Sequence, residues 1–93
     1  IVIDSRDILR NPEYMMKRLC KELEIPFETS MTSWPEGKKD CDGIWAKHWY
    51  GEVWKSTKFN KYIKKEISLS EQHIKLYDEC KILYDELFKF RII

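Results

Sequence analysis

The stretch VIDSRDILRNPEYMMKRLCKELEIPF, residues 2–27, decides the fold class because it joins a strand signal directly to a helix signal. Together with Ile1, its first residues form a continuous β-branched run, which is typical of a strand buried in a parallel sheet. We expect a short strand over residues 1–4. A strand this short is stable only beside other strands, so its partners are expected from a missing segment, another chain or a rearranged terminus.

The residues just after this strand allow two interpretations. Asp4 and Ser5 stand where α/β folds place ligand-contacting groups, but the same residue types also cap helices and form turns, and capping is favoured. Further on, Asn11, Pro12 and Glu13 mark a helix start. Asn accepts from free backbone N–H groups, Pro is pre-set for the first helical position, and Glu suits the positive end.

A helix over about residues 12–24 follows from apolar residues that recur at helical spacing: Met15, Met16, Leu19, Cys20 and Leu23. We expect both methionines in the core. Pro26 ends the helix because the residue before a proline is pushed out of the helical region. Residues 27–34 are expected to hold one short helical turn.

Aromatic residues concentrate in the middle of the chain. Pro35 and Gly37, together with charge and a lack of periodicity, predict a loop over residues 34–43. An aromatic helix is then expected over about residues 44–55, with Trp45, Trp49 and Val53 four apart on one face. These side chains have three possible uses: core, a stacking surface for a base or substrate, or a lid over a site built elsewhere.

Lysines dominate the next segment, residues 55–66. In a helix they would share a broad face able to hold phosphate or nucleic acid, although a solvated face is commoner and nucleic-acid binding is the weakest interpretation. This set comprises Lys55, Lys58, Lys61 and Lys65. A closing helix is expected over about residues 69–90. It would start either at a capping box of Ser68 with Glu71 or at Ser70, and we expect its apolar stripe in the core.

Composition bounds the function classes. The 93 residues allow one domain at most, and 43% hydrophobic and 35% charged residues describe a soluble globular chain. A net charge of +1 names no partner, and the longest apolar run is three residues, which excludes a membrane-spanning helix. Cys20, Cys41 and Cys80 are odd in number and far apart, so we expect neither a disulfide framework nor a zinc knuckle, and a reducing cytoplasm fits best. Cys20 and Cys80 fall on apolar helical stripes, where we expect packing residues.

Catalytic signals are weak. His48 and His73 are the only imidazoles, and neither stands in a nucleophile-and-base pattern, so we assign no catalytic residue and no metal ligand. The three glycines are isolated, so the sequence contains no Gly-rich phosphate loop.

The order of these segments resembles the C-terminal part of the P-loop sulfotransferase-like proteins, in particular a bacterial and environmental branch. The resemblance lies in the opening stretch, in MTSWPEGKKDCDGIWAKHWYGEVWKSTKF at residues 31–59, and in ECKILYDELFKFRI at residues 79–92. In that family the opening stretch reads D-x-x-D-L-x-x-D-P-E-x-x-L-x-x-L-C-x-x-L-G-I-P-F.

The resemblance implies a doubly wound α/β fold and transfer of a sulfuryl group from 3′-phosphoadenosine-5′-phosphosulfate (PAPS) to a hydroxyl or amine. In the family the donor sits on an N-terminal phosphate loop, which this sequence does not contain. We therefore expect residues 1–93 to be a single partial domain, mainly α, with three to four helices and the short N-terminal strand. Alone it should be inactive, and its partner should be the missing N-terminal part of the same fold.

The resemblance also implies site positions. The residues turned toward the nucleotide would be Ser56, Thr57 and Lys58. Candidates near the substrate are Lys47, His48 and Trp49. The aromatic helix would pack Trp45, Trp49 and Val53 inward against the open sheet edge, so that core and lid are one segment. The alternative is a small helical protein-interaction module, and both readings predict self-association through exposed apolar surface.

Overall fold

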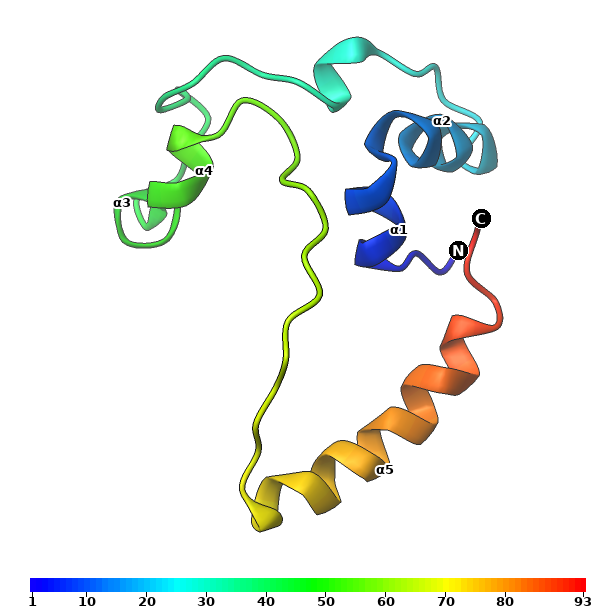
Figure 1. Cartoon of the computed structure of the whole chain (residues 1–93). Helices are drawn as coiled ribbons and strands as arrows, with labels where there is room; N and C mark the ends of the chain where they lie inside the picture. The colour runs from blue at the N-terminus through cyan, green and yellow to red at the C-terminus, as the bar shows by residue number, and fades with distance from the viewer.

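Short helices joined by long irregular segments make up the computed structural model, which describes all 93 residues (Figure 1). The elements in order are α1 (Ser5–Arg10), α2 (Pro12–Glu22), the 3₁₀ turn η1 (Thr29–Met31), α3 (Ala46–Trp49), α4 (Gly51–Lys55) and α5 (Glu71–Phe88). The predicted mainly helical class is confirmed, with five α-helices where three to four were expected.

The first helix, α1, was not expected from the apolar pattern. It begins at Asp4, whose carboxylate accepts a hydrogen bond of 2.8 Å from the backbone N–H of Arg6, so the capping interpretation of Asp4 is confirmed. Asn11 then ends α1 and starts α2: its N–H donates to the Asp7 carbonyl, and its side chain accepts from the N–H of Tyr14. Pro12 takes the first helical position as predicted.

Helix α2 was expected to reach about residue 24 but ends at Glu22. Glu24 has a left-handed φ of 56°, and the N–H groups of Glu24 and Ile25 turn back to the carbonyls of Lys21 and Cys20 at 3.3 and 3.0 Å. This is the Schellman pattern, in which a left-handed residue after the helix satisfies its last carbonyls. On α2 Met15 and Cys20 are buried, with the Cys20 Sγ 3.6 Å from Sδ of Met31 in η1, while Met16 is only half-buried.

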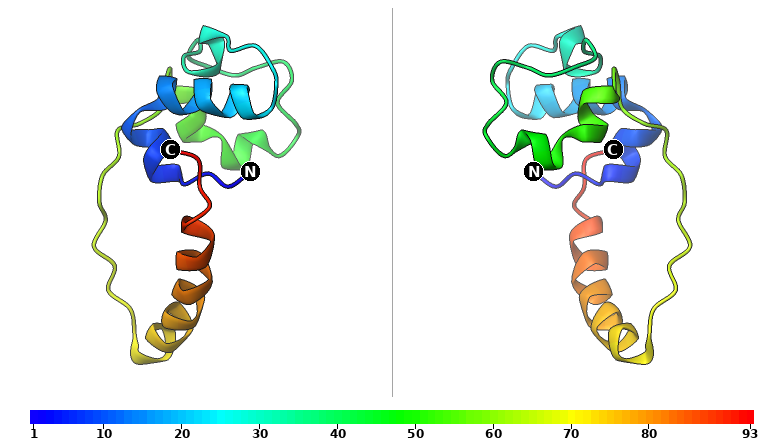
Figure 2. Two further views of the ribbon diagram at one scale, coloured as in Figure 1. Left: turned by 90° about the vertical axis from the view of Figure 1, so that its right-hand side faces the viewer. Right: turned by 90° about the vertical axis from the view of Figure 1, so that its left-hand side faces the viewer.

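The two ends of the chain lie side by side, as the views in Figures 1 and 2 agree. Val2 and Arg91 form an isolated parallel β-bridge, with a hydrogen bond of 3.0 Å from the Ile92 N–H to the Val2 carbonyl. The strand expected over residues 1–4 is thus reduced to a single bridge. One bridge is all that two short extended segments can form without further strands.

The expected aromatic helix over residues 44–55 is two helices, α3 and α4, which meet at Tyr50 and Gly51. Gly is the weakest helix former after Pro, and the break separates the residues that were to share one face. Correspondingly, the predicted inward packing of Trp45, Trp49 and Val53 is wrong for this chain: they are 69%, 76% and 55% exposed. No sheet is present for that face to cover.

The closing helix α5 is shorter than the predicted 69–90 range. Ser70 rather than Ser68 holds the N-cap position, although its hydroxyl lies 3.1 Å from Nδ1 of His73 and caps no backbone group. Every α5 residue except Phe88 is exposed, so the predicted core stripe is wrong here, and Cys80 is exposed while Cys20 is buried. Figure 1 shows α5 running away from the other helices, and α1 with α2 and α3 with α4 are the helix pairs that pack closely.

The chain as a whole is expanded. Its radius of gyration is 16.6 Å, against about 12 Å for a compact chain of this length. Only four residues are buried: Asp4, Met15, Cys20 and Ala46. None of the helices combines the length and the apolar character needed to cross a membrane.

Candidate functional site

The residues predicted to face a nucleotide, Ser56, Thr57 and Lys58, follow α4 in an extended stretch. Residues 33 and 34 hold this stretch in place. Lys58 forms an antiparallel bridge with Ser33, and the Thr57 carbonyl accepts a hydrogen bond of 2.9 Å from the Trp34 N–H. The structure therefore fixes the backbone of all three residues.

The side chains of these three residues differ in whether they can still donate a hydrogen bond to a ligand. The Ser56 hydroxyl donates to the Val53 carbonyl at 2.7 Å and accepts from the Trp34 indole N–H at 3.0 Å. Because a hydroxyl has one proton, Ser56 cannot donate to an anion while the Val53 bond persists. Thr57 and Lys58 are exposed, and neither side chain hydrogen-bonds within the chain, so the hydroxyl and the ammonium are free to donate.

Two tryptophans that sequence reasoning did not select fasten this stretch to loop 34–43. Trp34 bonds Ser56 and meets the Phe59 ring edge-to-face at 5.5 Å. Trp54 donates its indole N–H to the Asp42 carboxylate at 2.8 Å, and its carbonyl accepts from the Gly37 N–H at 2.7 Å. The available signal was chemical: an indole N–H that becomes buried needs an acceptor, and Ser56 and Asp42 lie in or next to the aromatic segment at residues 43–59.

Asp42 is the electrostatic anchor of this loop. The backbone N–H of Lys39 donates to its carboxylate at 2.9 Å, and this bond, followed by the bond from Trp54, lowers the pKa of Asp42. The Lys38 ammonium also lies 5.9 Å from the centre of the Trp54 ring. Asp42 is thereby held ionised as a structural acceptor.

The predicted substrate-proximal residues Lys47, His48 and Trp49 lie together on α3, and all three are exposed. The His48 ring sits 5.9 Å from the ring of Trp45, tilted by 45°. No hydrogen bond or ring contact joins these residues to Ser56, Thr57 or Lys58. The predicted substrate-proximal residues and the predicted nucleotide-facing residues therefore form two separate groups.

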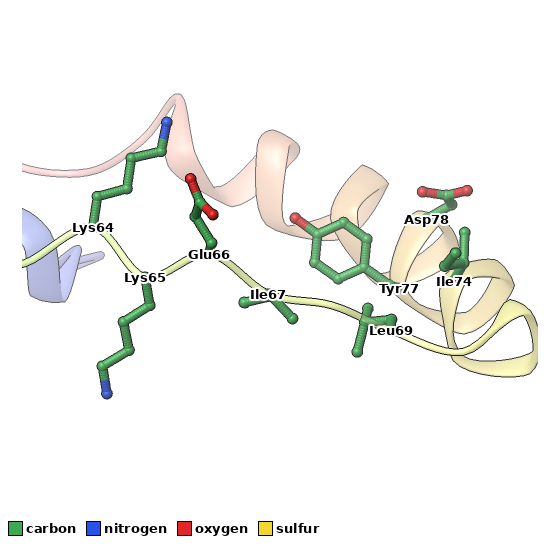
Figure 3. A pocket seen from close by; sticks show the side chains of 8 residues that line it. All are labelled: Lys64, Lys65, Glu66, Ile67, Leu69, Ile74, Tyr77 and Asp78. Atoms are coloured by element: carbon green, nitrogen blue, oxygen red, sulfur yellow. The ribbon is translucent and has the colours of Figure 1, made fainter.

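A hollow of about 720 Å³ lies elsewhere, between the extended segment and the start of α5. Figure 3 shows the side chains of Lys64 and Glu66 on one side of the extended segment and Lys65 on the other. The rest of the lining is Asp78 and four apolar or aromatic residues: Ile67, Leu69, Ile74 and Tyr77. The hollow contains Lys65 of the predicted lysine face but none of the residues predicted to face a nucleotide or a substrate. No cluster of three His, Cys, Asp or Glu side chains is placed to hold a metal ion.

The most densely bonded group of side chains joins the two ends of the chain. Asp4 accepts from the Arg6 guanidinium at 3.1 Å and from the Tyr84 hydroxyl, which in turn accepts from Arg6 at 2.8 Å. Asp7 accepts from Arg91 at 2.8 Å. We call these residues, together with Phe88, the terminal cluster.

Aromatic and charge contacts tighten the terminal cluster. The guanidinium carbons of Arg6 and Arg91 lie 4.9 and 3.6 Å from the centre of the Phe88 ring. Burial is the largest influence on Asp4 and opposes its ionisation, but the bonds from Tyr84 and Arg6 together outweigh it and lower the pKa of Asp4. Donation to Asp4 raises the pKa of Tyr84. Each charge in the terminal cluster is already paired, so the cluster is suited to holding the two ends of the chain together rather than to proton transfer.

Comparison with known proteins gives one family. A model of the sulfotransferase domain matches residues 1–73. Two Arabidopsis thaliana proteins, named branched-chain-amino-acid aminotransferase-like protein 2 and protein 1, are each 38% identical over 86 residues. The match covers 92% of this chain but only 15% and 16% of theirs. No solved structure matches.

Proposed function

Because the chain belongs to the sulfotransferase domain family, we propose that it supplies the C-terminal helical cover of an intact sulfotransferase-like protein. The proposed reaction of that protein is transfer of a sulfuryl group from PAPS to a hydroxyl or amine. The family match over residues 1–73 is the observation that carries the proposal. The small share of the relatives that the chain spans, 15–16%, and its four buried residues support a part that needs a larger body.

In the proposed reaction the acceptor oxygen or nitrogen forms a bond to sulfur as the bond from sulfur to the donor's phosphate oxygen breaks. The phosphate oxygen leaves as 3′,5′-ADP, and the acceptor proton goes to a base outside this chain. The phosphate cradle also comes from the missing N-terminal part of the fold, since the three glycines here are isolated. The isolated chain is therefore inactive.

Within this scheme residues 56–58 contribute hydrogen-bond donors to the phosphate groups of the nucleotide. Thr57 and Lys58 have a free hydroxyl and a free ammonium, which donate to phosphate without needing deprotonation. Ser56 serves the same surface by bonding Trp34 and holding the stretch in place. Lys47, His48 and Trp49, exposed on α3, are the proposed contacts to the acceptor.

The test compares the purified chain with the same chain grafted in place of the matching region of an active family member. We expect release of 3′,5′-ADP from PAPS by the graft and none by the isolated chain. In the graft, Lys58→Ala should raise KM for PAPS about 10-fold, as expected for losing a charged hydrogen bond. Lys61→Ala, which removes an exposed lysine three residues away, should leave KM unchanged. Turnover by the isolated chain, or equal effects of the two substitutions, contradicts the proposal.

The name of the plant relatives gives no second activity to this chain. It describes proteins of which the chain matches only 15–16%, and the same residues match the sulfotransferase domain.

A second candidate function is a small helical interaction module that self-associates. The observation that favours it is α5, on which every residue but Phe88 is exposed, including Leu76, Leu83 and Leu87. Sedimentation of the isolated chain over a hundredfold concentration range tests it, and a monomer throughout contradicts it. For either function we place the protein in the reducing cytoplasm, because Cys20, Cys41 and Cys80 are all free.

A further inference from the structure

The chain ends meet in a specific way that neither sequence pattern nor family match describes. Val2 and Arg91 are bridged in parallel, and Ile92 donates its N–H to the Val2 carbonyl at 3.0 Å. Both segments are rich in isoleucine, IVI at residues 1–3 and RII at residues 91–93. The predicted closing helix stopped at about residue 90, and no strand was predicted for residues 91–93.

A parallel pair has a defined topological meaning. Parallel strands require a crossover connection, usually containing a helix, and they occur almost only in sheets covered on both faces. Here the connection ends in α5, which leads into residues 91–93 and returns the chain beside residues 1–3 (Figure 2). One isolated bridge is not a strand pair, but the order of extended segment, helix and parallel extended segment is the connectivity of a β–α–β unit with an unusually long crossover.

The unit is incompletely covered. Ile1 and Ile93 are 68% and 65% exposed. On α5 the spacing of Leu76, Leu83 and Leu87 places them along one face, and all three are exposed. In a β–α–β unit the crossover helix buries such a face against the sheet.

From this geometry we propose that Arg91–Ile93 is a β-strand of the sulfotransferase domain's sheet, parallel to residues 1–3. A further parallel, β-branched strand from the rest of the domain pairs with an outer edge of these two strands and packs against the leucine face of α5. The proposal rests on the proposed function only in requiring that the rest of the domain exists.

The occupant is the rest of the domain and not a second copy of the chain. Two copies joined edge to edge about a two-fold axis perpendicular to the sheet would pair strands antiparallel, and an antiparallel strand beside a parallel pair is less usual than a further parallel strand. In addition, the chain spans only 15–16% of its curated relatives, so most of such a protein lies outside it and is available to cover this edge.

Amide hydrogen exchange tests the proposal. The chain is substituted for the 86 matched residues of each Arabidopsis protein, giving two full-length grafts. Peptides covering residues 1–4 and 89–93 should exchange at least 10-fold more slowly in a graft than in the isolated chain. Ile92→Pro, which removes the donor to Val2, should abolish this protection in the graft, and the conservative control Ile92→Val should keep it.

Equal exchange of these peptides in graft and isolated chain, with α2 protected in both, overturns the proposal. Failure of both grafts to protect even α2 also overturns the proposal. A chain whose edge fits the rest of the domain should fold when it is placed in that domain. The result is independent of catalysis. A graft that protects these amides without transferring sulfuryl groups defeats the proposed function alone, and an active graft with unprotected amides defeats the strand alone.

Discussion

The terminal region of the chain, made of α1, α2 and the end of α5, differs from the aromatic segment, residues 43–59, in how it is held together. Three of the four buried residues, Asp4, Met15 and Cys20, lie in the terminal region. Its side-chain bonds join residues 78 to 84 positions apart. The aromatic segment buries only Ala46 and is fastened to the loop 12 to 22 positions before it.

The tryptophans show what this difference means. Trp34 and Trp54 have an acceptor for the indole N–H and are half-buried, whereas Trp45 and Trp49 have none and are exposed. An indole is buried readily only where its N–H finds a partner. The terminal region is thus closed by paired charges, while two of the three indoles in the aromatic segment, Trp45 and Trp49, stay exposed.

The largest effect is expected from a substitution of Asp4 in the terminal region. Asp4→Ala removes the α1 cap and the acceptor of Arg6 and Tyr84. Losing a cap costs about 1 kcal/mol, and with the charged hydrogen bonds we expect α1 to open about 2 kcal/mol more easily. Amide exchange of residues 6–10 measures this. Asp40→Ala, in the exposed loop, is the control, and equal exchange in the two variants contradicts the role of Asp4.

Acid should weaken both regions in the same direction but through different carboxylates. The folded-state pKa values of Asp4 and Asp42 lie below the ordinary value of 3.8. Their stabilisation is therefore complete above pH 3.8 and is lost as the pH falls through the folded-state pKa values. We expect a smaller effect than truncation, because a protonated carboxyl still accepts hydrogen bonds.

Titration of amide exchange from neutral to acid pH separates the two carboxylates. Asp4→Asn should remove the pH dependence of α1, and Asp42→Asn that of the 37–42 loop. If either substitution changes the pH profile of both regions equally, the regions are not independent.

A smaller effect tests the aromatic segment. Trp34→Phe keeps a ring against Phe59 but removes the donor to Ser56. One such bond is worth about 1 kcal/mol, so the amide of residue 34, which pairs with Thr57, should exchange about 5-fold faster. Trp45→Phe removes an indole without an acceptor and should change nothing. A similar response to both substitutions would mean that the indole bond does not hold this segment.

Local signals in the sequence predicted the start of α2 and the cap at Asp4, because Asn11, Pro12 and Asp4 act on backbone groups within three residues of themselves. They also predicted the short turn before Trp34, which is η1. The pairing of Arg91 with Asp7 could not be predicted this way, since 84 residues separate them and neither residue type specifies its partner.

The candidate site was predicted in part. The spacing of Trp45, Trp49 and Val53 predicted one helical face, but spacing alone does not show that Gly51 starts a new helix. The structure keeps Ser56, Thr57 and Lys58 together and adds Trp34 as the residue that holds them, and their role toward a nucleotide stays a prediction. For α5 the apolar residues recur at helical spacing as predicted, but no other part of this chain covers them.

The smallest effect concerns Glu24, which stands where the family pattern has glycine. Its left-handed φ of 56° costs a non-glycine residue about 1–2 kcal/mol, against about 0.4–1 kcal/mol of extra unfolded-state entropy that glycine brings. Glu24→Gly should therefore stabilise α2 by about 0.5 kcal/mol net. Glu22→Gly, inside the helix, should destabilise it by up to about 1 kcal/mol. Urea denaturation followed by helical circular dichroism measures both, and a loss of stability in Glu24→Gly would show that this residue's side chain matters more than its backbone.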